Sequence, residues 1–264
     1  MQITGILSRN SPGSWVGSLL RMPLRLLPHD SVMTVRSGLN KGLKWIVGSS
    51  IHGCWLGHYE HDKQEVVARL VKPGMHVLDI GANAGFYTLA FSRLVGSSGH
   101  VWAFEPLAEN MHNLSRHVRL NRIGNATLVQ IAVADKTEIL AFDVAPSNSM
   151  GRISDKEGSY WVPAASIDEL ISRGLIPLPD LIKLDVEGAE SRVLAGAHSL
   201  LRRHRTVFLI ALHGEAQMRG CPRILKEAGY EVFKLDGRPV ATGEDRFVDE
   251  IMAAPVGYRW PRPD

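Results

Sequence analysis

Apolar and polar residues alternate along the chain in blocks that predict strands followed by helices. The first pair lies at 62–80, where apolar residues at helical spacing end at 72–74 and a short apolar run begins at 75. A helix at 86–95, a strand at 100–104 and a helix at 107–120 continue the alternation. Such alternation is typical of a parallel sheet that helices cover on both faces.

The second half of the chain continues this pattern. The stretch 206–212 is almost wholly apolar, which fits a strand buried on both faces. We therefore predict an α/β fold, a doubly wound, mostly parallel, Rossmann-like sheet with helices on both faces. Ligands bind such sheets at the carboxyl ends of the strands. The further strands are expected at 126–133, 139–144, 181–184, 230–235 and 249–253, and the helices at 86–95, 166–173, 189–201 and 222–228.

The start of the chain has a different character. Within 1–28, apolar residues are mixed with arginines, and Pro23 and Pro28 interrupt any helix. We expect residues 1–56 to form an N-terminal extension that acts as a lid or an acceptor-binding segment, and residues 57–264 to form the main domain. The alternative for the extension is contact with a membrane surface. No apolar run reaches the ~18–20 residues of a membrane span.

Charge and cysteine content exclude several classes of protein. The formal net charge of the 264 residues is only +3, and no block of lysine and arginine suggests a nucleic-acid partner. Cys54 and Cys221 form no CxxC pair, so a zinc or redox motif is absent, and both thiols are expected in the core. A chain that needs no disulfides fits the cytoplasm.

A glycine-rich turn follows the strand at 75–80, in the sequence VLDIGANAGFYTLAF. Gly81 and Gly85 allow a sharp turn and a close approach of the backbone to a ligand. The helix that follows directs free N–H groups and a partial positive charge at the same place. Glu105 ends the next strand, where a carboxylate can accept hydrogen bonds from the two hydroxyls of a ribose. This arrangement predicts a nucleoside site.

The residues of the turn favour S-adenosylmethionine over a dinucleotide. Dinucleotide sites usually carry GxGxxG, whereas this turn reads GANAG, with Ala82 where the middle glycine would admit a pyrophosphate. Asp79 stands just before the turn and suits a cofactor with an ammonium group. S-adenosylmethionine has a ribose, a carboxylate and an ammonium but no phosphate. The alternative is an ordinary strand-to-helix turn.

A second candidate site follows the strand at 181–184. In LIKLDVEGAE, Asp185 and Glu187 lie at the mouth of a buried strand, where an isolated charge is costly unless it is paired or used. For Glu190 we favour a role as a helix-capping acid. His213 follows the strand at 206–212, and an imidazole that titrates near neutral pH can accept the proton of a hydroxyl.

These blocks resemble the FkbM family of methyltransferases in their residues and their order. VLDIGANAGFYTLAF, GHVWAFEP and LIKLDVEGAE carry the resemblance, with GHYE at 57–60 before them and ALHG at 211–214 after them. The family implies S-adenosylmethionine and methyl transfer to a hydroxyl of a sugar, lipid or secondary metabolite. By matching positions, it implies Asp79, Gly81, Asn83, Gly85 and Glu105 around the cofactor, and Asp185, Glu187 and His213 near the acceptor.

The hypothesis from sequence is therefore an O-methyltransferase in which His213 or Asp185 is the base and Glu187 orients the acceptor. The loop at 146–154 is expected to help shape the acceptor pocket. No metal site is predicted, although Asp185 and Glu187 offer the oxygen ligands that Mg²⁺ prefers. The rival interpretations are a non-catalytic scaffold and a nicotinamide-dependent oxidoreductase. The sequence makes no prediction of oligomeric state.

Overall fold

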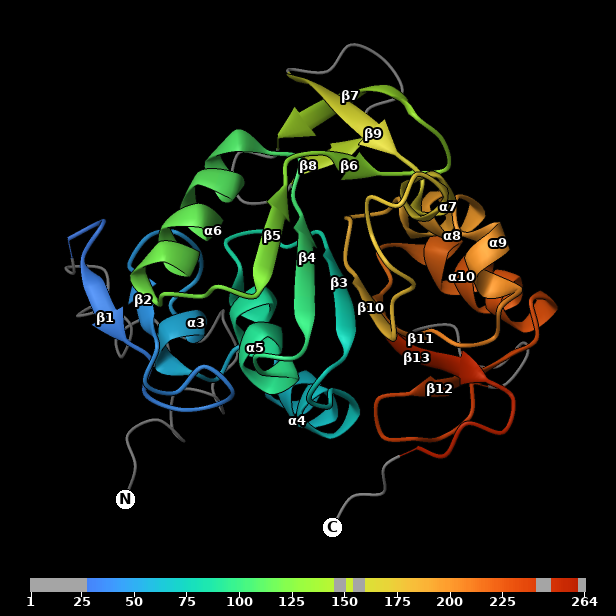
Figure 1. Ribbon diagram of the computed structural model, residues 1–264, viewed down its shortest axis with the longest axis horizontal. Coiled ribbons are helices and arrows are strands. Elements are labelled where there is room, and N and C mark those ends of the chain that lie inside the picture. Colours follow the sequence, from blue (N-terminus) through green and yellow to red (C-terminus); the bar gives the residue numbers. More distant parts are fainter. Residues whose placement is uncertain (1–27, 145–150, 154–159, 241–247, 261–264) are drawn as a thin grey trace.

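A seven-stranded sheet forms the centre of the computed structural model, which describes residues 28–144, 151–153, 160–240 and 248–260 (Figure 1). Its strand order is β12-β13-β11-β10-β3-β4-β5. All pairings are parallel except those of β13, which runs antiparallel to both of its neighbours. The predicted doubly wound, mostly parallel sheet is confirmed. The strands are β3 (His76–Ile80), β4 (His100–Phe104), β5 (Ala126–Val129), β10 (Leu181–Leu184), β11 (Val207–Ala211), β12 (Tyr230–Lys234) and β13 (Glu250–Pro255).

Side chains of the central strands alternate between two buried faces. Leu78 and Ile182, partners in the β3–β10 register, belong to one hydrophobic cluster, while their neighbours Val77 and Leu181 belong to the other. The first cluster is covered by α7 (Ile167–Ser172), α8 (Glu190–Ala195), α9 (His198–Leu201) and α10 (Glu215–Glu227). The second is covered by α4 (His61–Leu70) and α5 (Phe86–Val95). Figure 1 shows the orange α7–α10 group at one side of the sheet and α6 (Ala108–Leu120) near the other, beside β5.

A second sheet lies between β5 and α7 in the sequence and stands above the central strands in Figure 1. Its strands are β6 (Ala132–Val133), β7 (Glu138–Val144), β8 (Gly151–Ile153) and β9 (Tyr160–Ala165), in the order β6-β9-β7-β8. The prediction of one strand at 126–133 is wrong. The N–H of Ile131 bonds the carbonyl oxygen of Val129, and this tight turn sends the chain into the second sheet. Except for 151–153, the loop predicted at 146–154 lies outside the described residues.

Residues 28–56 pack against the glycine-rich turn and α6. β1 (Val32–Thr34) and β2 (Lys44–Ile46) form an antiparallel pair that α3 (Gly53–Leu56) follows. Trp45 is fully buried and stacks on His117 with ring centroids 4.0 Å apart. The His117 ring also accepts from the N–H of Ile46 at 3.0 Å and donates to the carbonyl oxygen of Ala84 at 2.7 Å. The segment is thereby tied to the turn beside the predicted cofactor site.

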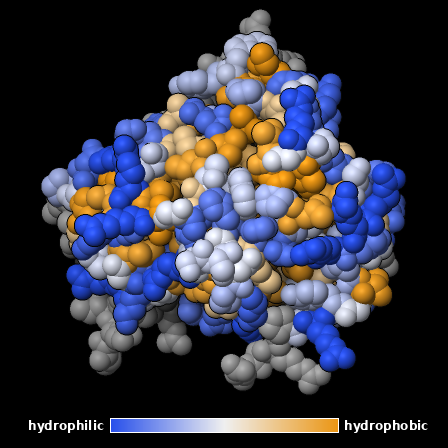
Figure 2. All heavy atoms as spheres, in the orientation of Figure 1, coloured by the Kyte–Doolittle hydropathy of each residue, from blue (hydrophilic) through white to orange (hydrophobic). Residues whose placement is uncertain are grey.

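The remaining differences from the sequence predictions are local. The helix expected at 189–201 is broken into α8 and α9, and α10 begins at Glu215 rather than at 222. Cys54 and Cys221 are buried free thiols, as predicted. Across the described residues, no helix is long and apolar enough to cross a membrane. Residues 1–27, for which contact with a membrane surface was considered, lie outside the described part. Hydrophobic residues also reach the surface at the top of Figure 2. In the second sheet, Ile139 of β7 and Trp161 of β9 are exposed.

Candidate active site

A cavity of about 440 Å³ opens at the carboxyl ends of β3, β4, β10 and β11. The glycine-rich turn after β3 forms its floor together with the residues that follow β10. The second sheet contributes Phe142, α4 contributes Lys63, and the segment before α3 contributes Ile51. The size suits a small-molecule site, and the position is the one expected for ligands of a parallel sheet.

The two glycines of the turn are required by space as well as by backbone angle. Gly81 has a φ of 75°, and a Cβ atom there would collide with the carbonyl oxygen of Asp185. Gly85 has a φ of 95°, and a Cβ there would meet the side chain of Leu114. Asn83, between them, takes a φ of 49°, a left-handed conformation that asparagine tolerates better than most residues. The turn thus presents its backbone to the cavity.

Glu105 ends β4 and lies against this turn. Its Oε2 accepts a hydrogen bond from the N–H of Asn83 at 2.8 Å, and its Oε1 accepts from the N–H of Leu107 at 3.0 Å and from Nδ2 of Asn110 at 3.2 Å. Burial raises the pKa of Glu105, although these three donors work in the opposite direction. The carboxylate is therefore held in a fixed orientation on the cavity wall, where it can accept further bonds from ligand hydroxyls.

Asp79 does not line the cavity but lies beneath the turn. Its side chain is fully buried, and its Oδ2 accepts a hydrogen bond from the hydroxyl of Thr88 at 2.6 Å. Its Oδ1 lies 3.4 Å from Nζ of Lys183, its register partner on β10. Of the predicted cofactor residues, Gly81, Asn83 and Glu105 border the cavity, whereas Asp79 and Gly85 do not.

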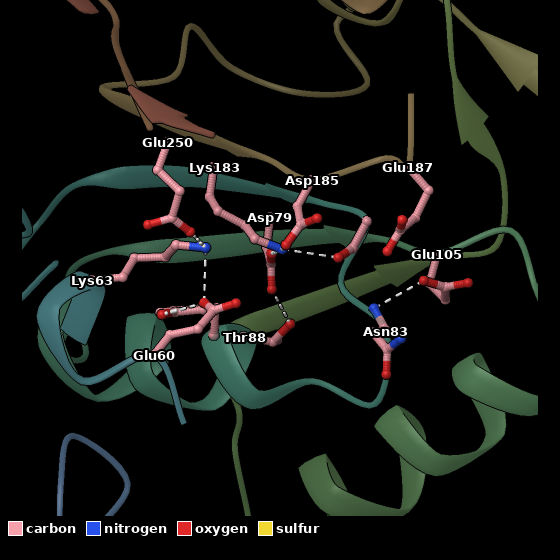
Figure 3. Close-up of polar contacts among 12 residues, drawn as sticks. Glu60, Lys63, Asp79, Asn83, Thr88, Glu105, Lys183, Asp185, Glu187 and Glu250 are labelled. Carbon is pink, nitrogen blue, oxygen red and sulfur yellow. Dashed lines mark hydrogen bonds and ion pairs between the residues drawn. The ribbon is translucent and has the colours of Figure 1, made fainter. Parts of the chain in front are cut away.

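Lys183 links the two halves of the site. Its Nζ donates to the carbonyl oxygen of Gly81 at 2.9 Å and lies 3.4 Å from Oδ2 of Asp185 (Figure 3). Burial alone would lower the pKa of this lysine, but the charges of Asp185, Asp79 and Glu60 outweigh it and raise the pKa. A permanently charged lysine thus fixes both the cofactor turn and the first acid after β10.

The structure brings the three predicted acceptor-side residues together. Nε2 of His213 lies 3.7 Å from Oδ1 of Asp185 and 3.6 Å from Oε2 of Glu187. Nδ1 of the same ring lies 2.8 Å from Oε1 of Glu190, which is fully buried in the first turn of α8. Glu190 also accepts the N–H of Gly188 at 3.1 Å, so it serves the start of the helix, as predicted, and orients the imidazole as well.

The surroundings of His213, Asp185 and Glu187 shift the pKa values of these three groups in different ways. The hydrogen bond to Glu190 raises the pKa of His213 to about 8, against the effect of burial and with the help of the Asp185 charge. Burial opposes ionisation of Asp185, but Lys183 and Lys63 outweigh it and hold its pKa below the usual value. Burial raises the pKa of Glu187. His213 is therefore the strongest base of the three near neutral pH.

Sequence reasoning missed several charged residues of this cavity. Lys183, Lys63, Glu60 and Glu250 were not singled out, and Glu190 was read only as a cap. Lys183 had a usable signal, because it is the one charged residue in the apolar strand LIKL. Lys63 and Glu250 had none, since they lie on α4 and β13 and meet only through the fold.

Comparison with known proteins points to one family. Residues 79–232 match the model of the methyltransferase FkbM domain. The chain is 25% identical over 194 residues to the hexuronic acid methyltransferase AglP of Haloferax volcanii, covering 71% of this chain and 78% of that protein. It is 28% identical over 173 residues to the 2-O-methyltransferase NoeI of Sinorhizobium fredii, covering 55% of this chain and 66% of that protein.

Solved structures include similar folds at low sequence identity. A crystal structure of methyltransferase FkbM from Methylobacillus flagellatus is 20% identical with a TM-score of 0.48, over 69% of this chain and 43% of that one. An S-adenosylmethionine-dependent O-methyltransferase from Thermotoga maritima is 15% identical with a TM-score of 0.48, over 91% of this chain and 82% of that one.

Proposed function

This chain belongs to the FkbM family of methyltransferases, as its motifs suggested, and we propose that it transfers a methyl group from S-adenosylmethionine to a hydroxyl of a sugar-like acceptor. Membership of a methyltransferase family does not favour the two rival interpretations, a non-catalytic scaffold and a nicotinamide-dependent oxidoreductase. Two of the curated relatives are named for a hexuronic acid and for a 2-O position, which supports a sugar-like acceptor. Its buried free thiols fit the cytoplasmic location that we propose.

The cofactor side of the cavity fits S-adenosylmethionine. Glu105 offers a fixed carboxylate for the ribose hydroxyls, and the backbone between Gly81 and Gly85 allows close approach. Acidic residues outnumber lysines on the cavity wall, which suits a ligand with a sulfonium and an ammonium. The bound cofactor supplies a methyl group made electrophilic by the adjacent sulfonium.

The observation that carries the proposed reaction is the geometry of His213. Glu190 holds Nδ1, so Nε2 faces Asp185 at 3.7 Å and Glu187 at 3.6 Å. Neutral His213 can accept the hydroxyl proton at Nε2 while the oxygen attacks the methyl carbon. Bound S-adenosylmethionine would supply the carbon for the new oxygen–carbon bond, and its sulfur would keep the electron pair of the carbon–sulfur bond that breaks. Asp185 and Glu187 favour the resulting imidazolium, and Glu187 is placed to orient the acceptor.

A divalent cation is a second candidate at the same place. One ligand atom from each of Asp185, Glu187 and His213 lies within 4.8 Å of the others. Carboxylate oxygens suit Mg²⁺, which would acidify an acceptor hydroxyl directly. We propose the metal-free base, in which Glu190 holds Nδ1 and Nε2 takes the proton, and a chelator distinguishes the two candidates.

The test is methyl transfer from labelled S-adenosylmethionine to a panel of methyl hexosides and hexuronic acids. The proposal expects an alkali-stable methyl ether on a hydroxyl. Label found only as an alkali-labile ester would contradict the hydroxyl acceptor. No transfer to any polyol by folded, cofactor-bound protein would contradict the sugar-like class.

A further inference from the structure

We propose that Glu60 and Glu250 bind the ammonium group of the methionine part of S-adenosylmethionine, and that Lys63 positions both carboxylates. This inference rests on the proposed function, since it concerns the same cofactor. The ammonium group of the cofactor still needs an acidic partner in the cavity. The amino-acid end of the cofactor carries an ammonium, and the acid expected to meet it, Asp79, is fully buried beneath the turn and bonded to Thr88.

Glu60 and Glu250 are two of the acidic residues that line the cavity, where Glu105, Asp185, Glu187 and Asp249 also lie. Their side chains are 26% and 23% exposed, and both border the cavity. Lys63 lies between them with only 3% exposure. Its Nζ is 2.8 Å from Oε2 of Glu60 and forms an ion pair with Glu250. The hydroxyl of Tyr87, in the first turn of α5, donates to the same Oε2 of Glu60 at 2.8 Å.

The net charge of Glu60, Glu250 and Lys63 favours the binding of one further cation. Two carboxylates surround one lysine, so the group carries a net negative charge in a partly buried place. The nearby Lys183 is shared with Asp79 and Asp185, each 3.4 Å from its Nζ, so the four acids around Lys63 and Lys183 outnumber the two lysines. Partly buried charge without a partner is unfavourable, and a ligand ammonium would restore the balance.

The backbone at Glu60 also points to a binding role. Glu60 has a φ of 46°, a left-handed conformation that seldom suits glutamate. Of the six non-glycine residues with positive φ in the described ranges, Glu60, Asn83 and Glu187 line this cavity. Backbone strain that gathers around a cavity is typical of residues held in place for a ligand.

The group lies at the opposite end of the site from Glu105. In Figure 3, Glu60, Lys63 and Glu250 stand on one side of Asp185, and Glu105 with Asn83 stands on the other. A ligand whose ribose is held by Glu105 would extend past Asp185 toward Glu60. Its reactive centre would then lie beside the residues that we propose for the acceptor.

Two nucleosides test the inference by binding alone. S-adenosylhomocysteine carries the amino-acid end, whereas 5′-methylthioadenosine has the same thioadenosine without it. Glu60→Gln and Glu250→Gln should each weaken binding of S-adenosylhomocysteine by roughly 10-fold or more, as expected for a lost charged hydrogen bond. They should leave the affinity for methylthioadenosine within about 2-fold, because that nucleoside has no ammonium.

The matched control is Glu65→Gln, on the exposed side of α4 and outside this cavity, which should alter neither affinity. Unchanged binding of S-adenosylhomocysteine by both folded variants would overturn the inference, as would an equal loss for both nucleosides. Wild-type protein that binds neither nucleoside would contradict the proposed function itself, so the two failures are distinguishable.

Discussion

The fully buried carboxylate of Glu190 lies 2.8 Å from Nδ1 of His213. Because this contact fixes one ring nitrogen, it decides what the other can do. Nε2 is left facing Asp185 and Glu187 on the cavity wall. The pair therefore resembles other carboxylate–histidine dyads, in which the acid selects the tautomer and stabilises the imidazolium.

Removal of the imidazole tests its role as the base. His213→Asn should lower kcat by roughly 10²–10⁴-fold, the usual contribution of a general base. Binding of S-adenosylmethionine should change little, because His213 lies on the acceptor side. Single-turnover methyl transfer and a binding titration on the same preparation check both statements. A kcat within a few-fold of the wild-type value would show that another group removes the proton.

The pH dependence of kcat/KM should report the same residue. The raised pKa of His213, about 8, means that the imidazolium predominates below that pH and has no lone pair at Nε2. Activity of chelator-treated enzyme should thus rise with pH and level off above about 8. Glu190→Gln removes the main cause of the raised pKa, so its profile should level off at a lower pH. Identical profiles for the two enzymes would contradict the dyad.

A chelator separates the base from the metal alternative. Protein treated with EDTA should keep its full rate of methyl transfer, since no step of the proposed reaction uses a metal ion. Loss of activity that added Mg²⁺ restores would instead assign Asp185 and Glu187 to the cation.

Two glycine substitutions test the packing of the cofactor turn. Gly81→Ala should destabilise the fold by more than about 2 kcal/mol, because its Cβ would collide with the backbone of Asp185 and its φ is positive. Gly220→Ala is the matched control. Gly220 lies within α10 with open space around it, so alanine should stabilise the fold by about 0.5–1 kcal/mol. Denaturant unfolding measures both, and equal stability of the two variants would contradict this account of the turn.

Sequence patterns predicted the elements that obey simple periodicity. The strands at β3, β4, β10 and β11 appear as short apolar runs, and the turn at Gly81–Gly85 follows from its glycines. The strand predicted at 139–144 is β7, but the second sheet to which it belongs was not foreseen. Its β6 continues an apolar run begun by β5, and only a backbone turn at Ile131 separates the two strands.

Some site residues could likewise be predicted from local sequence, whereas others depend on how the chain folds. Glu105, Asp185 and His213 could be proposed because each directly follows a recognisable strand. The roles of Asp79 and Lys183 depend on strand register, which pairs them across β3 and β10 and turns Asp79 away from the cavity. The contact between Lys63 and Glu250 joins distant parts of the chain, and no local pattern announces it.

Calorimetric titration with S-adenosylmethionine, beside NAD, tests the central claim most directly. The account predicts a saturable isotherm for S-adenosylmethionine and none for NAD. Binding should be weaker in Glu105→Gln, because the amide has only one acceptor oxygen and no charge for the ribose hydroxyls and the turn. Absence of binding to folded wild-type protein, or an affinity for NAD that matches that for S-adenosylmethionine, would contradict it.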